Sequence, residues 1–204
     1  MPIIDSYSES NKNATIILDN GDYDGVCQSF TNTSASTLDS CKLYLYKSGS
    51  PTGNCYAKIY AHSGTYGTSS VPTGDVLATS EALDVTTISN SVFELKTFSF
   101  TGANRISLSA TTYYVLTISF GGGPGYFDGI YVGIDSSSPT HDGNAGSLLG
   151  TTWSALSGND ACFYVYSASS GPANLKSYNT NLKANIKSIN TNAIANTKTL
   201  NTNA

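Results

Sequence analysis

Short segments in which apolar and polar residues alternate recur through the first 170 residues of the chain. In 42–46, Leu43 and Leu45 oppose Tyr44, and in 93–100, Phe98 and Phe100 share one side. A period of two is that of a half-buried strand. The expected strands, punctuated by Gly, Pro, Ser and Asn, are 14–18, 25–31, 38–46, 55–62, 75–79, 82–88, 92–101, 111–120, 129–134 and 161–167.

Strands at this spacing, with no helical pattern before residue 171, predict an all-β fold. We expect a jelly-roll-like β-sandwich over residues 14–170, preceded by a polar N-terminal arm over 1–13. Segments 38–46 and 55–62 are expected to form a hairpin, because the residues between them are dense in turn formers.

The end of the chain, 171–204, is a repetitive tail. It reads NLKSYNTNLKA, NIKSINTNAIA and NTKTLNTNA from residue 174, with a period of 11. Such regularity indicates repeated structural units that are too small to fold alone. We therefore expect the tail to assemble with the sandwich, with copies of itself or with a partner. The expected assembly residues are its apolar ones: Leu175, Tyr178, Leu182, Ile186, Ile189, Ile194 and Leu200.

Two conformations fit the tail. An 11-residue apolar spacing matches a right-handed helical coil. The abundant Asn and Thr are poor helix formers, so extended or β structure is favoured.

The net charge also differs between the tail and the rest of the chain, because residues 1–170 have a net charge of −8 and residues 171–204 one of +4. Four scattered lysines without arginine are a weak basis for nucleic-acid binding, so no nucleic-acid partner is expected.

Composition favours an extracellular location or a virion surface. Only 12% of residues are charged, so the polar surface must come from Ser, Thr, Asn and Gly, and tyrosine is abundant at 14 residues. The sequence shows neither a signal peptide nor a run of transmembrane length. We therefore expect no membrane span. The protein is expected to leave its cell either by means of a signal peptide that has been removed or by release inside an assembled particle.

Four cysteines, Cys27, Cys41, Cys55 and Cys162, lack the C-x-x-C spacing of a structural zinc site. They are either two disulfides or four small buried apolar residues. Because the first and last core strands of a sandwich commonly lie close together, Cys27 and Cys162 are the candidate pair for a disulfide.

An acidic loop follows the first expected strand. Asp19, Asp22 and Asp24 lie within six residues, in a pattern like the opening of a calcium loop. Thr31 occupies the place of the bidentate Glu that such a loop needs. The loop is therefore either a calcium site, the one cofactor considered, or an Asx-rich turn.

Aromatic residues in or near Gly-rich loops are the candidate ligand-binding residues: Trp153, Tyr126, Tyr131 and Tyr66. Loops at the edge of a sandwich commonly hold ligands, and aromatic rings beside amides and carboxylates suit sugars. The alternative is that these rings cap the core with their polar tips in water.

No catalytic residues are expected. The two histidines, His62 and His141, lie near many serines, but no G-x-S-x-G motif is present and no local signature marks a Cys-His pair. The sequence therefore predicts a protein that is not an enzyme.

Further motifs lie at 50–54, 57–65, 71–74, 77–80, 112–115 and 138–141. Together they resemble a jelly-roll domain of phage and metagenomic surface proteins, some of which are termed choice-of-anchor domains, and the resemblance spans about residues 14–167. The tail resembles the K-S-x-N repeats of phage and environmental-virus structural proteins. The resemblance implies exposure and a role in adhesion or decoration, without catalytic residues.

The principal functional hypothesis is a structural or display protein of an extracellular particle, such as a virion decoration, tail or fibre subunit. It would assemble through its C-terminal repeats with copies of itself or other structural subunits. The alternative is a carbohydrate-binding adhesion module of a cell surface, with glycans as partners.

Overall fold

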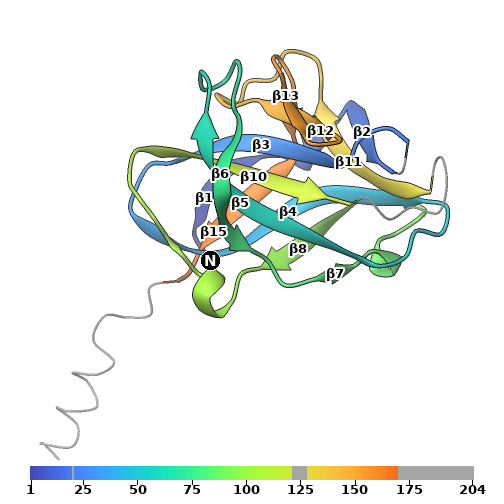
Figure 1. The fold of residues 1–204 in the computed structure, drawn as a ribbon, viewed down its shortest axis with the longest axis horizontal. Coiled ribbons are helices and arrows are strands. Elements are labelled where there is room, and N and C mark those ends of the chain that lie inside the picture. The colour runs from blue at the N-terminus through green and yellow to red at the C-terminus, as the bar shows by residue number, and fades with distance from the viewer. Residues whose placement is uncertain (20, 121–127, 170–204) are drawn as a thin grey trace, which may run out of the picture. The chain divides into compact units, whose positions relative to one another are not determined.

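Two antiparallel sheets form the part of the chain that the structure describes. The computed structural model describes residues 1–19, 21–120 and 128–169, and the strands named below are those of this part of the chain (Figure 1). Sheet 1 contains β1 (Ile3–Tyr7), β2 (Ala14–Leu18), β4 (Ser36–Ser48), β8 (Glu94–Ser99), β9 (Ser107–Leu108), β11 (Gly129–Asp135), β14 (Asp160–Ala161) and β15 (Phe163–Ser167). Sheet 2 contains β3 (Gly25–Asn32), β5 (Asn54–Ser63), β6 (Val71–Thr79), β7 (Leu83–Asp84), β10 (Thr112–Ser119), β12 (Ala145–Leu149) and β13 (Thr152–Leu156). The short 3-10 helices are η1 (Glu9–Asn11), η2 (Val85–Thr87) and η3 (Gly102–Asn104).

Sheet 1 is built around the long strand β4. Leu43 pairs with Phe163 of β15 and with Lys96 of β8, so β15 and β8 lie on opposite edges of β4. Further along β4, Leu45 pairs with Val132 of β11, and β11 lies on the same edge of β4 as β15, opposite β8. Strand β1 continues the sheet beyond β15, and β2 continues it beyond β11.

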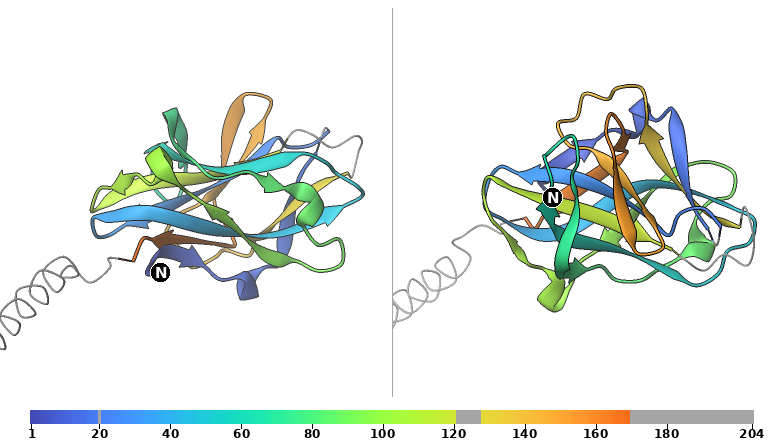
Figure 2. Two further views of the ribbon diagram at one scale, coloured as in Figure 1. Left: turned by 90° about the horizontal axis from the view of Figure 1, so that it is seen from below. Right: turned by 45° about the horizontal axis from the view of Figure 1, so that its top comes forward.

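Sheet 2 has the strand order β13-β12-β3-β10-β5-β6, and β3, β10 and β5 lie side by side at its centre (Figure 1). Strands β12 and β13 form a tight hairpin at one end of this order (Figure 2). Its two-residue connection places Gly150 at φ +62°, a left-handed conformation that glycine adopts without steric cost.

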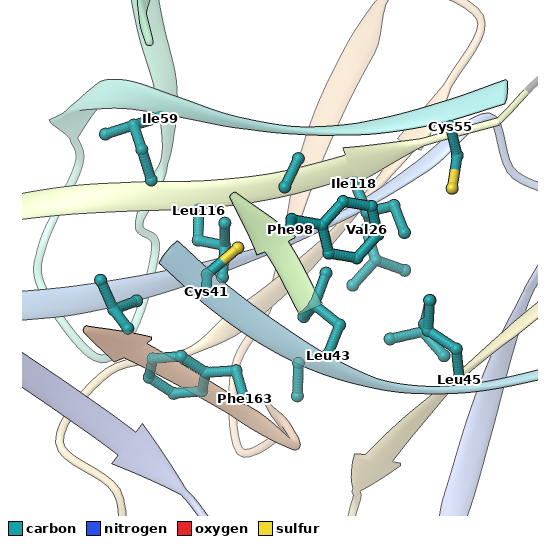
Figure 3. Packing of buried hydrophobic residues seen from close by; sticks show 14 of the residues in the cluster. Val26, Cys41, Leu43, Leu45, Cys55, Ile59, Phe98, Leu116, Ile118 and Phe163 are labelled. Carbon is teal, nitrogen blue, oxygen red and sulfur yellow. The ribbon is translucent and has the colours of Figure 1, made fainter. Parts of the chain in front are cut away.

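The core lies between the sheets and confirms the expected β-sandwich. Leu43, Leu45 and Phe163 of sheet 1 face Leu116 and Ile118 of sheet 2 (Figure 3), and all five are buried. The neighbouring Tyr44 is half-buried on the outer side of β4, as the alternation in 42–46 predicts. Burial of this apolar surface is the main source of the stability of such a fold.

The predicted hairpin between 38–46 and 55–62 is wrong. Strand β4 belongs to sheet 1 and β5 to sheet 2, so the connection between them crosses from one layer to the other. Gly49 takes a positive φ of 67° here, and a Cβ at this position would lie 1.5 Å from a carboxylate oxygen of Asp128. Turn-forming residues indicate a change of direction, but they do not specify which sheet receives the next strand.

The predicted polar arm over 1–13 also differs from the structure. Ile3–Tyr7 form β1, which pairs with β15 along the lower side of the sandwich in the edge-on view (Figure 2, left). Tyr7 is only 8% exposed and belongs to the core. The polar residues of this segment are held by hydrogen bonds to the sandwich, which the polarity of the sequence does not reveal.

All four cysteines are buried free thiols, so the disulfide interpretation, including the Cys27–Cys162 pair, is wrong. Burial raises the pKa of Cys55 and of Cys162 to about 12, and it also raises the pKa of Cys27 and Cys41. The thiols are therefore the small apolar core residues of the alternative interpretation.

Candidate functional site

A pocket of about 210 Å³ opens where β1 of sheet 1 approaches β3 of sheet 2. Its walls come from β1, from the end of β3, from the β5–β6 connection and from the loop that precedes β12. The residues that line it are Ile4, Asp5, Thr31, Thr33, Tyr66, His141 and Asp142. We call it the Tyr66 pocket.

A histidine between two carboxylates forms the floor of the pocket. His141 Nε2 lies 3.3 Å from Asp5 Oδ1, and His141 Nδ1 lies 3.4 Å from Asp160 Oδ1. The imidazole also packs edge-on against Phe163, with 5.3 Å between the ring centroids. Burial acts to lower the pKa of His141, but the two carboxylates outweigh burial and raise this pKa to about 9. At neutral pH the ring is therefore a cation that links β1 to β14.

Asp160 and Gln28 support His141 from behind. Gln28 Nε2 donates to Asp160 Oδ1 at 2.6 Å, and Gln28 Oε1 accepts from the N–H of Ala161 at 2.7 Å. Asp160 is fully buried, and its Oδ2 atom has no hydrogen-bond partner among the described residues. Burial raises the pKa of Asp160, while His141 and Gln28 act to lower it. The charge on His141 is thus needed to offset a carboxylate that water does not reach.

A second polar contact fastens the N-terminal segment. The Tyr7 hydroxyl donates to Asp135 Oδ2 at 2.6 Å, and Asn13 Nδ2 donates to Asp135 Oδ1 at 2.5 Å. Ser137 donates to the same Asp135 Oδ1 through both its N–H and its hydroxyl. These bonds, first among them those from Ser137 and Tyr7, lower the pKa of Asp135 to about 2.

One wall of the pocket is aromatic. The ring of Tyr66 stacks on that of Tyr113, with 4.0 Å between the centroids and 14° between the planes. The ring of His62 lies 5.5 Å from that of Tyr113, and Tyr113 is 45% exposed. Burial raises the pKa of Tyr66 to about 12; a hydrogen bond from Thr31 acts against this, and nearby carboxylates, with Asp5 first among them, add to it.

A glycine lets the Tyr66 loop reach the pocket. Gly67 has φ +76°, and a Cβ at this position would lie 2.3 Å from the carbonyl oxygen of Asp142. The close contact of the two loops, and with it the position of Tyr66 beside Asp142, therefore depends on this residue having no side chain.

The predicted ligand-binding residues do not form one site. Tyr66 lines the pocket, but Tyr126 lies outside the described residues. Trp153 lies on β13 and covers Gly25, with its Cη2 atom 3.2 Å from the place that a Cβ of Gly25 would occupy. Tyr131 lies on β11 of sheet 1, 5.7 Å from Tyr46 between ring centroids.

Tyr131 belongs to an aromatic row on the outer face of sheet 1. Phe93 lies 5.2 Å from Tyr44 and 5.3 Å from Tyr46 between ring centroids, and Lys12 Nζ lies 4.5 Å from the centroid of Phe93. These rings pack against one another and are half-buried. The row is a surface separate from the Tyr66 pocket.

The acidic loop forms a hydrogen-bonded turn. Asp19 Oδ1 accepts from the N–H groups of Gly21 and Asp22, at 2.9 and 2.8 Å, and Asp24 Oδ2 accepts from the N–H of Gly150 at 2.7 Å. In the described ranges, Asp19, Asp22 and Asp24 are not gathered into a group that would hold a metal ion. The Asx-turn interpretation accounts for these bonds, and calcium binding stays a prediction.

The predicted assembly residues, Leu175 to Leu200, lie outside the described residues, as does the predicted conformation of the tail. In the part of the chain that the structure describes, no helix has the length and apolar character required to cross a membrane. No protein-family model matches the sequence, and no curated protein matches it.

Proposed function

We propose that this chain is a non-enzymatic β-sandwich module, exposed on the outside of a particle or cell, that binds glycans in the Tyr66 pocket. The observation on which this rests is Tyr66, which lines the pocket together with the carboxylates of Asp5 and Asp142 and is stacked on Tyr113. An aromatic ring offers an apolar surface to the face of a sugar, and the carboxylates accept hydrogen bonds from its hydroxyl groups.

The size of the pocket favours a sugar at the end of a chain or a short oligosaccharide. At about 210 Å³, the pocket is smaller than the about 300–1,000 Å³ that ligand pockets commonly enclose. This volume suits one sugar unit. A further pocket of about 260 Å³ shares Ile4 and Thr33 with it, so the two adjoin. A second sugar unit has room there.

The state of the reactive side chains supports a binding role. Burial raises the pKa of the cysteine thiols, which disfavours the thiolate that acts as a nucleophile. Both ring nitrogens of His141 face carboxylates that hold the imidazole in place. These groups serve packing and charge pairing in the sandwich.

A glycan array with substituted proteins tests the proposal. Tyr113→Ala removes an exposed ring that supports Tyr66, and we expect binding to fall at least about fivefold, since stacking of an aromatic ring contributes about 1 kcal/mol or more. Tyr56→Ala is the matched control, because Tyr56 is 37% exposed and pairs with Ser119 at the other end of β10. An array on which the unsubstituted protein binds no glycan would contradict the proposal.

A second proposed role is assembly through residues 171–204, in a virion decoration, tail or fibre subunit. The 11-residue repetition and the net charge of +4 against −8 in the rest of the chain favour this role. The partners would be copies of the chain or other structural subunits, and the jelly-roll resemblance fits such a protein. Nucleic acid is not among the proposed partners.

Deletion of 171–204 tests the assembly role. Since Met1–Ala168 form one compact unit, we expect the shortened protein to fold and to stay monomeric in light scattering, while the full chain forms larger species. Equal assembly by both proteins would exclude the tail as the assembly element.

A further inference from the structure

We propose that the Tyr66 pocket selects a sugar that has a free primary ammonium group, that is, an amino sugar. The inference rests on the proposed glycan-binding function and names the class of ligand. It comes from the charge, the aromatic wall and the unused hydrogen-bonding capacity of the pocket.

The charge of the pocket favours a cation. Asp5 and Asp142 line it, and among the described residues that line it there is no Lys or Arg. Among these described lining residues the one cationic group is His141, which already lies between Asp5 and Asp160. Its charge therefore offsets the carboxylates of the floor and leaves Asp142 without compensation. An anionic sugar would be repelled, and an ammonium group would be attracted.

The two carboxylates have different roles. Asp5 accepts hydrogen bonds from the N–H groups of Ser6 and Thr31, both at 2.8 Å, so its charge is fixed in place. Asp142 is exposed, and it makes no hydrogen bond or ion pair through its carboxylate with the described residues. Asp142 is thus the carboxylate available to accept hydrogen bonds from a ligand, and an ammonium group has three donors to offer.

The aromatic wall favours the same ligand. The ring of Tyr66 lines the pocket and is held by its stack on Tyr113. Cations are attracted to the faces of aromatic rings, and the attraction adds to that of a nearby carboxylate. A sugar ring with an ammonium substituent can contact the aromatic surface and the Asp142 carboxylate together.

Calorimetry with three ligands of equal length tests the inference on the full chain. The ligands are a glucosamine tetramer, its fully N-acetylated form and a uronic-acid tetramer. Because acetylation removes the charge, we expect the glucosamine tetramer to bind about tenfold more tightly than the acetylated form, from the carboxylate and the ring together. The uronic-acid tetramer should bind most weakly. Raising the salt concentration should reduce the preference, since the Asp142 carboxylate is exposed.

Asp142→Asn keeps the shape of the side chain and removes its charge. It should reduce binding of the glucosamine tetramer about two- to fivefold and leave binding of the acetylated tetramer unchanged. Asp75→Asn is the control, because Asp75 is exposed on β6, does not line the pocket and changes the net charge equally.

The failures are distinguishable. If the acetylated tetramer binds as tightly as the glucosamine tetramer, the selection of an ammonium group is wrong and glycan binding stands. If neither tetramer binds and the glycan array is also silent, the proposed function is wrong. If Nα-acetyl-lysine amide, which has a free ε-ammonium group and no sugar, binds as tightly as the glucosamine tetramer, the pocket recognises ammonium without the sugar. The assignment of an amino sugar is then overturned.

Discussion

His141 holds together two segments that are far apart in the chain. Its partners, Asp5 and Asp160, lie on β1 and β14, and its side chain is only 8% exposed. Gly143 also donates its N–H toward His141 Nδ1, at 3.1 Å. The neutral ring can accept this bond, whereas the protonated ring presents Nδ1–H to Asp160. The imidazole therefore has partners in both states, but only the cation balances the carboxylates of Asp5 and the buried Asp160.

The free energy of unfolding should fall at alkaline pH as His141 loses its proton. Its pKa is raised from 6.5 to about 9 in the folded protein, so the contribution is fully present below pH 6.5 and is lost as the pH rises through about 9. A shift of this size corresponds to about 3 kcal/mol. Urea unfolding followed by fluorescence between pH 6 and 10 measures the loss.

His141→Gln provides the comparison for this pH dependence. The substitution leaves Asp160 buried beside a neutral amide, so we expect a loss of about 3 kcal/mol at pH 6. The substituted protein should then show a flatter curve from pH 6 to 10. An unchanged slope in His141→Gln would assign the alkaline loss to another group.

The sequence reveals only part of this site. Tyr66 is recognisable because it is an aromatic residue between glycines in a loop. Asp5 lies 136 residues from His141 along the chain, and nothing near either residue indicates the other. Tyr113 is read from the sequence only as a strand residue, because its exposure depends on which neighbours cover the outer face of sheet 2.

Among the elements, β1 contributes most to the site for its length. It supplies Asp5 and Ile4 to the pocket and Tyr7 to the core. It also forms the edge of sheet 1 beyond β15. A five-residue strand of this kind joins the sandwich through one partner strand and a few long-range polar contacts.

Deleting residues 1–8 distinguishes a strand from a free arm. The deletion removes Tyr7 from the core and leaves His141 and Asp160 without Asp5, so we expect a loss of at least about 3 kcal/mol in the free energy of unfolding. Thermal unfolding of the shortened and full chains measures it. A melting temperature that does not change would mean that the segment is the free polar arm.

Segments rich in β-branched and long apolar residues are predicted well, and segments with few of them are missed. Residues 14–18 were predicted as a strand and form β2 with the same bounds. Strands β12 and β13 were missed because Ala, Gly and Ser dominate Ala145–Leu149 and few β-branched residues mark Thr152–Leu156. Gly146 nevertheless suits its place, since a Cβ there would lie 2.7 Å from Cys27 Sγ.

For the whole molecule, the absence of cross-links has a direct chemical consequence. Cys27, Cys41, Cys55 and Cys162 are buried free thiols, and burial raises the pKa of each. We expect almost no reaction with iodoacetamide in the native protein and four labelled cysteines after unfolding without a reducing agent. Mass spectrometry counts the labels. Two unlabelled cysteines in the unfolded, non-reduced chain would show a disulfide.

The sequence by itself determined that the chain folds as a β-sandwich, because a period of two in apolar residues is a local property of each strand. It also determined the repetitive tail. Only the tertiary structure decided that β4 and β5 lie in different sheets, that β1 belongs to the sandwich, and that Asp5, His141 and Asp160 meet. Pairing between distant strands depends on which buried faces fit together, and that is a property of the whole core.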